Sequence, residues 1–284
     1  MVETSPALLP TLAAWADRAG AADALASGTG QPPVLLLVTS DAVTAEQVAA
    51  GASTVAPLAD AAGADVRVTL TDPSVTGGLP ADQVELYLEL GHRTVDDAVD
   101  SGTPLLVVGG TGAAVTTASV TATVCRKEPV SVVRHTVGAD PAVWRQEVTA
   151  VRDAMFRARG YRNGPWDAGS AREILRILGT PELAVTVGIL HQAAARRTPV
   201  ILDGADTFAA ALLADAIAPG STDWWMAAHV PPAPSAGPAL DRLQLTPAID
   251  RDLGPDRGGA GLTALALLRL AVRSSRTATP PPGA

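Results

Sequence analysis

The sequence predicts an α/β protein with a three-layer, Rossmann-like fold, in which helices cover both faces of a parallel sheet, with additional helices. Three observations predict it. Short apolar runs of strand length recur along the chain, helical segments separate most of them, and glycines or prolines mark the joints. At 284 residues, 47% of them hydrophobic, the chain is long enough to bury a large core.

The strands are predicted from apolar runs, of which the first is Val-Leu-Leu-Leu-Val. A continuous run of this kind is typical of a strand that is buried on both faces. The predicted strands are residues 34–38, 65–70, 104–108, 199–204 and 224–229. A helical segment between most neighbouring strands indicates that the strands pair in parallel.

The helices are predicted from the spacing of apolar residues and from proline and glycine at helix ends. The segment 80–102, for example, has proline in its first turn and ends at Gly102. Pro57 is expected to interrupt the helical segment 44–63. The other predicted helices are residues 6–26, 113–125, 140–159, 168–178, 181–196, 206–218, 238–245 and 261–272.

No internal repeat and no linker divides the chain. We therefore expect a single α/β domain over residues 1–273, which includes an N-terminal helical segment at residues 1–30. Residues 274–284 are rich in serine, threonine and proline, so a disordered tail is expected there.

The composition argues against several functional classes. A net charge of −8 disfavours a nucleic-acid-binding surface, which needs clustered lysine and arginine to contact phosphates. No apolar run approaches the roughly 20 residues of a membrane span, so no membrane partner is expected. The first residues lack the basic start and apolar stretch of a signal peptide, and a cytoplasmic location is expected.

The cysteine and histidine content points away from disulfide and metal chemistry. The single cysteine, Cys125, cannot form an intrachain disulfide, and a buried structural thiol is expected rather than a nucleophile. The four histidines show no metal-ligand spacing. Neither a metal nor a cofactor is expected.

Ligands of open parallel sheets bind beyond the carboxyl ends of the strands. Four segments with glycine or polar residues are expected there, namely residues 109–117, 202–207, 227–233 and 254–261. Glycines let backbone N–H groups approach an anion, and the hydroxyls of Thr116 and Thr117 could add donors. The first segment, Gly-Gly-Thr-Gly-Ala-Ala-Val-Thr-Thr, has neither a P-loop nor a complete dinucleotide fingerprint, so phosphate binding and simple close packing both stay open.

Two residues at strand ends have both a functional and a structural interpretation. Asp203, before Gly204, could bind ribose hydroxyls, or it could cap a helix or a turn. His229 could be a catalytic base, although a lone histidine is more often a hydrogen-bonded structural residue.

A series of segments, taken in order, resembles one known family. Residues 174–220 look like the family's Gly-Gly-x-Glu-Ile-Ala helix, with Glu182 in it, followed by its Pro-Val-(hydrophobic)-x-Asp-Gly strand. Residues 224–234 stand where the family has Ser-His-x-Ser-x-Glu, and residues 42–68 resemble its early Glu-Val-Thr helix and the strand after it. From about residue 34 to 272 the chain thus resembles the nicotinate-nucleotide–dimethylbenzimidazole phosphoribosyltransferase family of cobalamin biosynthesis.

The resemblance implies that phosphoribose is transferred from nicotinate mononucleotide to 5,6-dimethylbenzimidazole, which gives α-ribazole 5′-phosphate and nicotinate. It also implies a small-molecule nucleotide and an aromatic base as ligands, and a homodimer as the assembly. The matching segments suggest nucleotide or phosphate binding by Gly110, Gly112, Thr116, Thr117, Asp203, Gly204, Arg257 and Gly258, with Glu46, Glu182 and His229 as further site residues.

Two glutamates of the family are replaced in this chain. Alignment on the threonine pair puts the first at Gly110, and alignment on the last helix puts the second at Arg257. A lost general base typically lowers the rate roughly 10²–10⁴-fold, and Asp256 is the candidate substitute. The alternative is a non-catalytic paralogue, which binds nucleotide or benzimidazole or forms a mixed oligomer with an active family member.

Overall fold

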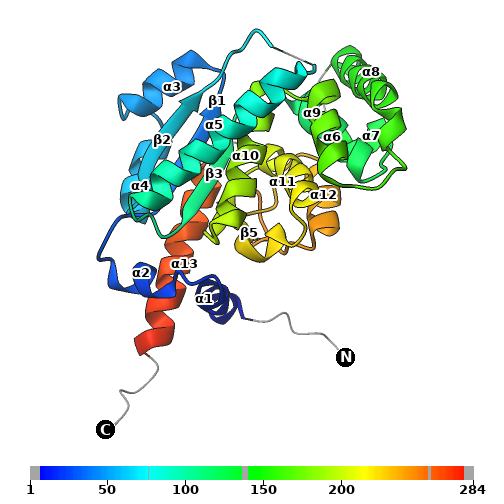
Figure 1. Ribbon diagram of the computed structural model, residues 1–284. Coiled ribbons are helices and arrows are strands. Elements are labelled where there is room, and N and C mark those ends of the chain that lie inside the picture. The colour runs from blue at the N-terminus through cyan, green and yellow to red at the C-terminus, as the bar shows by residue number, and fades with distance from the viewer. Residues whose placement is uncertain (1–6, 76, 136–139, 255–256, 278–284) are drawn as a thin grey trace, which may run out of the picture.

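The computed structural model of the protein describes residues 7–75, 77–135, 140–254 and 257–277, and its centre is a five-stranded parallel sheet (Figure 1). The strands are β1 (Val34–Thr39), β2 (Asp65–Leu70), β3 (Leu106–Gly110), β4 (Val200–Leu202) and β5 (Trp225–Ala227). Their order in the sheet is β2-β1-β3-β4-β5. This is a doubly wound order, and its switch point lies between β1 and β3.

Helices cover both faces of the sheet (Figure 1). On one face lie α5 (Ala81–Asp100), α6 (Ala114–Val124), α9 (Ala168–Leu178), α10 (Pro181–Ala195), α11 (Ala205–Ile217) and α12 (Ala236–Leu243). On the other face lie α1 (Leu8–Arg18), α2 (Ala22–Ser27), α4 (Val55–Ala62) and α13 (Gly259–Thr277). The short helix α3 (Ala42–Ala49) lies beside β1 and β2, while α7 (Pro129–Val132) and α8 (Pro141–Arg157) pack on α6. Two 3₁₀ turns, Arg159–Tyr161 and Ser221–Trp224, connect neighbouring elements.

The burial pattern of the central strands explains why they are apolar without alternation. In β1, Leu36 and Val38 pack into the core under α5 and α10, and Leu35 packs into the core on the opposite face, under α4 and α13. All six residues of β1 are buried. The predicted fold class, a parallel sheet with helices on both faces, is therefore confirmed.

The predicted single helix over residues 6–26 is wrong, because the described part of this segment forms α1 and α2 with a turn at Gly20. Gly20 has a φ of 73°, a left-handed conformation that glycine adopts at little cost. Local sequence favoured one helix because alanine and leucine dominate the whole segment.

The interruption predicted at Pro57 lies earlier in the chain. α3 ends at Ala49 and is followed by Gly51, whose φ is 66°. Pro57 lies in the first turn of α4. Proline is tolerated there because the backbone N–H that it lacks would have no acceptor within the helix. At the other end, α13 continues to Thr277, so residues 274–277 are helical rather than part of a tail, and residues 278–284 lie outside the described residues. The assignment of residues 1–273 to one domain stays a prediction.

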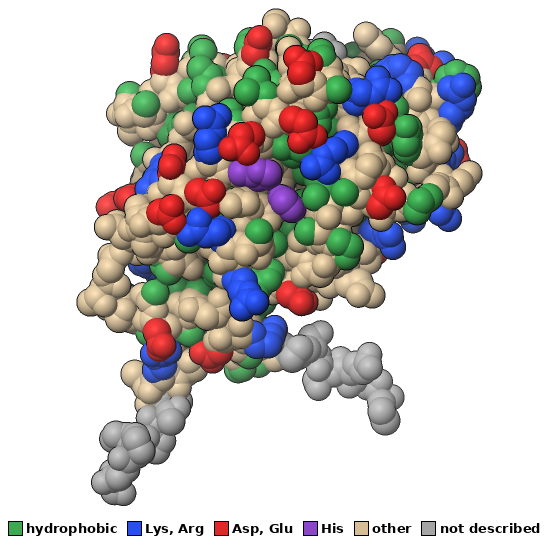
Figure 2. Space-filling model, in the orientation of Figure 1, with side chains coloured by type: hydrophobic (Ala, Val, Ile, Leu, Met, Phe, Trp, Pro, Cys, Tyr) green, Lys and Arg blue, Asp and Glu red, His purple; other side chains and the backbone are tan. Residues whose placement is uncertain are grey.

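The surface mixes charges of both signs. Figure 2 shows acidic and basic side chains interspersed over one face, with histidine side chains near its middle. Nε2 of His92 on α5 lies 3.1 Å from Nδ1 of His191 on α10. Burial lowers the pKa of His191, and the neighbouring His92 adds to this effect.

Within the described ranges, no helix has the length and apolar character needed to span a bilayer.

Cys125, at the C-terminal end of α6, is half-buried, and its Sγ donates to the carbonyl oxygen of Pro238 at 3.3 Å. Burial raises the pKa of this thiol to about 11. At pH 8 only about 0.1% would be thiolate, so we expect Ellman's reagent to modify the folded protein roughly 100-fold more slowly than the guanidinium-unfolded chain. Equal rates in the two states would contradict this prediction.

Candidate functional site

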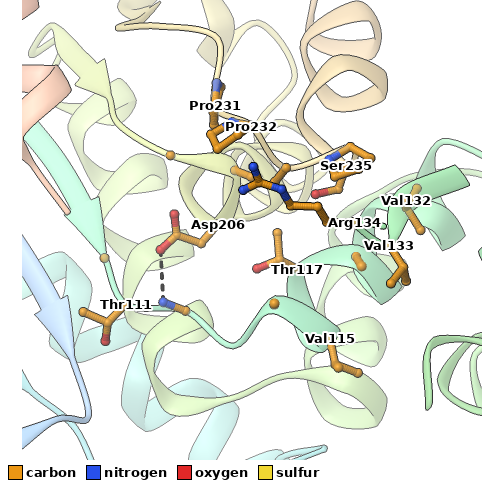
Figure 3. A pocket seen from close by; sticks show the side chains of 18 of the residues that line it. Thr111, Val115, Thr117, Val132, Val133, Arg134, Asp206, Pro231, Pro232 and Ser235 are labelled. Carbon is orange, nitrogen blue, oxygen red and sulfur yellow. Dashed lines mark hydrogen bonds between the residues drawn. The ribbon is translucent and has the colours of Figure 1, made fainter. Parts of the chain in front are cut away.

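A cavity of about 480 Å³ lies at the carboxyl ends of β3, β4 and β5 (Figure 3). Ligands of parallel sheets bind at this end, and the volume is in the range of small-molecule sites. The loops after the three strands line it together with α6, α8 and the segment after α7. Its apolar wall is formed chiefly by Val115, Val132, Val133, Val151, Pro231 and Pro232. The cavity therefore offers both a polar and an apolar surface.

Close backbone contacts shape the glycine loop after β3. Thr111 donates its N–H to the carbonyl oxygen of Val38, and its hydroxyl lies 2.8 Å from that of Thr39 at the end of β1. A Cβ on Gly109 would come within 3.0 Å of the backbone nitrogen and Cα of Gly258. Glycine at position 109 thus lets the segment before α13 lie directly on the end of the strand.

Asp203 joins β4, β5 and α13 next to the cavity. Its Oδ2 accepts the N–H groups of Gly258 and Gly261, each at 2.9 Å, and its Oδ1 lies 3.3 Å from Nε2 of His229. Nδ1 of His229 accepts the N–H of Leu253 at 3.4 Å, so the ring proton is assigned to Nε2, facing the carboxylate. Asp203 and His229 are only 6% and 2% exposed. These contacts match the structural interpretations of both residues, a cap and a hydrogen-bonded histidine.

Two arginines provide positive charge at the cavity. Arg134 comes from the segment after α7, and Figure 3 shows it extending over the cavity opposite Asp206. Arg257 lines the cavity from the segment before α13, and its Nη1 lies 3.5 Å from the hydroxyl of Thr44 on α3. Guanidinium groups bind phosphates or carboxylates through paired hydrogen bonds. The cavity is therefore suited to an anionic ligand.

Asp206 lines the cavity but was not predicted from the sequence as a site residue. It lies in the first turn of α11, and its Oδ2 accepts the N–H of Gly112 at 3.1 Å (Figure 3). Burial raises the pKa of its carboxyl group, and the nearby carboxylate of Asp203 contributes to this rise. Its position two residues after the Asp-Gly pair that follows β4 is the sequence signal that could have identified it.

The other predicted site residues are divided between this cavity, a smaller one beside it and positions outside both. Four of them line it, namely Gly110, Gly112, Thr117 and Gly204. Thr116 and Glu182 line a smaller adjoining cavity, which Asp206 also borders. Gly258 donates its N–H to Asp203, and Glu46, on α3, lines neither cavity. Asp256 lies outside the described residues.

Comparison with known proteins assigns the family. A family model described as Phosphoribosyltransferase matches residues 37–279. The chain belongs to this phosphoribosyltransferase family. Among curated relatives named nicotinate-nucleotide–dimethylbenzimidazole phosphoribosyltransferase, the Corynebacterium efficiens protein is 38% identical over 247 residues, which are 80% of this chain and 66% of that protein. The Mycobacterium tuberculosis protein is 37% identical over 256 residues, which are 81% of this chain and 69% of that protein.

The chain matches only part of the length of these relatives. A match to the Corynebacterium glutamicum protein, at 40% identity, covers 70% of this chain but only 54% of that protein. The matches to these three curated relatives thus span 54% to 69% of the relatives' own length.

Solved structures support the same fold for this chain. A crystal structure described as CobT from Thermus thermophilus has a TM-score of 0.75 and 25% identity, and the match covers 95% of this chain and 91% of that one. A second structure is described as a nicotinate-nucleotide–dimethylbenzimidazole phosphoribosyltransferase from the same organism. Its TM-score is 0.71 at 24% identity, and the match covers 95% of this chain and 96% of that one. The family model and the curated relatives confirm the family resemblance predicted from the sequence.

Proposed function

We propose that this chain transfers the phosphoribosyl group of nicotinate mononucleotide to 5,6-dimethylbenzimidazole or a related base, as a step of cobalamin biosynthesis. The products would be α-ribazole 5′-phosphate and nicotinate. The observation that carries the proposal is the cavity, which combines a glycine loop and two guanidinium groups with a wall of valines and prolines. A phosphate needs the first surface and a flat aromatic base needs the second.

The charges of the cavity also suit the reaction. The phosphate would lie near Arg134 and Arg257, and the base would lie against the apolar wall. When the bond to nicotinate breaks, its electrons neutralise the pyridinium nitrogen, and positive charge develops on the ribosyl group. The carboxyl groups of Asp203 and Asp206, at the same strand ends, would stabilise that charge.

The direct test is a product assay. The purified chain is incubated with nicotinate mononucleotide and 5,6-dimethylbenzimidazole, and α-ribazole 5′-phosphate is measured by chromatography and mass spectrometry. Product that increases with enzyme concentration supports the proposal. Binding of the nucleotide by calorimetry without any turnover would instead support the non-catalytic alternative.

Replacing either cavity arginine is expected to weaken nucleotide binding. Arg134→Ala and Arg257→Ala should each raise KM for nicotinate mononucleotide about 10-fold or more, because a charge-assisted hydrogen bond to phosphate contributes roughly 1.5–3 kcal/mol. Arg251→Ala is the matched control, since Arg251 is 82% exposed and pairs only weakly with its neighbour Asp250. An unchanged KM in both cavity variants would place the phosphate elsewhere.

We further propose a homodimer in the cytoplasm as the working form, as the family resemblance suggests. Light scattering coupled to size-exclusion chromatography measures the molar mass directly. A mass of one chain would contradict the homodimer. Co-purification with an active family member would favour the mixed oligomer instead.

A further inference from the structure

The carboxyl group of Asp206 occupies a space that three glycines leave free. A Cβ on Gly110 would lie 2.6 Å from Oδ2 of Asp206, and a Cβ on Gly112 would lie 2.8 Å from its Cβ. On the third side, a Cβ on Gly204 would lie 2.7 Å from Oδ1. A Cβ atom does not approach a non-bonded heavy atom so closely, so a side chain at any of these positions would displace the carboxyl group. The glycine loop and Asp206 are thus complementary in shape.

Asp206 also differs from the other two carboxyl groups that line the cavity, Asp203 and Glu147. Both oxygens of Asp203 are engaged, one by two N–H groups and the other by His229. Glu147 comes from α8 and not from the end of a strand. Oδ2 of Asp206 accepts the N–H of Gly112, and its Oδ1 lies toward Gly204. The backbone N–H groups of Thr207 and of Asp206 itself also favour the charged form of this carboxyl group. Of the three, Asp206 is the carboxyl group at the strand ends with capacity for a further partner.

The surroundings of Asp206 favour proton exchange. Burial is the largest influence on its pKa and raises it, because a charged carboxylate is poorly solvated there. A carboxyl group with a raised pKa holds a proton more readily near neutral pH, as general bases and acids do. The other titratable or charged described residues that line the two adjoining cavities are Asp203, His229, Glu147, Arg134, Arg257 and Glu182.

We propose that Asp206 accepts the proton of the incoming base during phosphoribosyl transfer by this chain. The proposal rests on the proposed function. In the step, the lone pair of one ring nitrogen of the benzimidazole bonds to C1′ of the ribosyl group. The C1′–N bond of nicotinate mononucleotide breaks, and its electron pair goes to the nicotinate nitrogen. The N–H proton of the second ring nitrogen passes to the carboxylate of Asp206, which balances the charge.

The place of Asp206 gives the replaced glutamate at Gly110 a physical interpretation. A side chain at position 110 and the carboxyl group of Asp206 would compete for the same space. In this chain the carboxylate therefore comes from the first turn of α11. The last residue of β3, Gly110, has no side chain that would obstruct this carboxylate.

The first test compares wild type with Asp206→Asn, which keeps the shape and one acceptor oxygen but cannot take a proton. We expect kcat to fall about 10²–10⁴-fold, with KM for nicotinate mononucleotide changed little. In wild type, kcat should fall as the pH decreases through the raised pKa of Asp206, and this acidic limb should vanish in the variant. Asp215→Asn, on the same helix but outside the cavity, is the matched control.

Thermal stability separates this role from a structural one. The folded-state pKa of Asp206 lies above its unfolded value, so stability is lost as the pH rises through that range. Asp206→Asn removes this cost, and its Tm at pH 8 should equal or exceed that of wild type, with the difference shrinking near pH 4. A kcat within threefold of wild type, or a loss of activity that merely follows a lower Tm, would overturn the proposal.

A double variant that moves the carboxylate from position 206 to position 110 tests whether the two side chains share one space. Asp206→Ala should be nearly inactive, and Gly110→Glu alone should also lose activity, because its side chain would collide with Asp206. The double variant Gly110→Glu/Asp206→Ala should recover at least tenfold over Asp206→Ala, since one carboxylate then fills the site. A double variant that keeps the wild-type Tm and binds nucleotide without any recovery would contradict the proposal.

Failure of the two proposals can be told apart. If wild type forms no α-ribazole 5′-phosphate, the proposed function fails and the role of Asp206 falls with it. If wild type and Asp206→Asn form product at the same rate, the proposed function stands and only the role of Asp206 is refuted.

Discussion

Asp203→Ala is expected to lower the free energy of unfolding by about 3–5 kcal/mol, as measured by urea denaturation. The carboxylate of Asp203 is only 6% exposed and is the acceptor for the N–H groups of Gly258 and Gly261. It also faces Nε2 of His229 at 3.3 Å. Alanine would leave these buried donors without a partner, and each such donor costs roughly 1–3 kcal/mol.

Asp203→Asn provides the matched comparison. Its amide keeps one acceptor oxygen for the start of α13, but its NH₂ group would face the N–H of His229. An intermediate loss of stability, about half that of the alanine variant, is therefore expected. A loss below about 1 kcal/mol for Asp203→Ala would show that water replaces the carboxylate, and the network would then not hold α13.

The fold could be predicted where local pattern and burial agree. The predicted strand at 65–70 and the predicted helix at 168–178 match β2 and α9 at every residue. By contrast, β3 extends through Gly109 and Gly110, two residues beyond the prediction, because they pair with Leu37 and Val38 of β1. Glycine alone indicates a turn, and only the neighbouring strand, which local sequence does not reveal, extends β3 into the loop.

The last helix shows the same effect of tertiary packing. α13 continues past residue 272 because it packs on α1 and α2, and Arg276 forms an ion pair with Asp23. Composition favoured a tail here, since serine and threonine are weak helix formers. The packing partner lies some 250 residues away in the sequence, so no local window could include it.

The candidate site was predictable in place but not in detail. The rule that ligands bind at the carboxyl ends of parallel strands correctly grouped the glycine loop with Asp203 and His229. It could not identify Asp206, because the importance of that carboxyl group depends on the missing side chains at Gly110 and Gly112. Those glycines lie more than 90 residues before Asp206, and only the folded chain brings them together.

Gly188→Ala is expected to lower the free energy of unfolding by about 2–3 kcal/mol, although alanine is the better helix former. Gly188 of α10 faces α5 so closely that a Cβ would lie 2.3 Å from the carbonyl oxygen of Leu88, and backbone cannot yield as a flexible side chain can. The control is Gly237→Ala, on the exposed side of α12 with no atom within 4 Å of the added Cβ. That variant should gain about 0.5 kcal/mol. Opposite signs for the same substitution would show that the helix crossing at Gly188, and not helix propensity, requires glycine, whereas a gain in both would refute this.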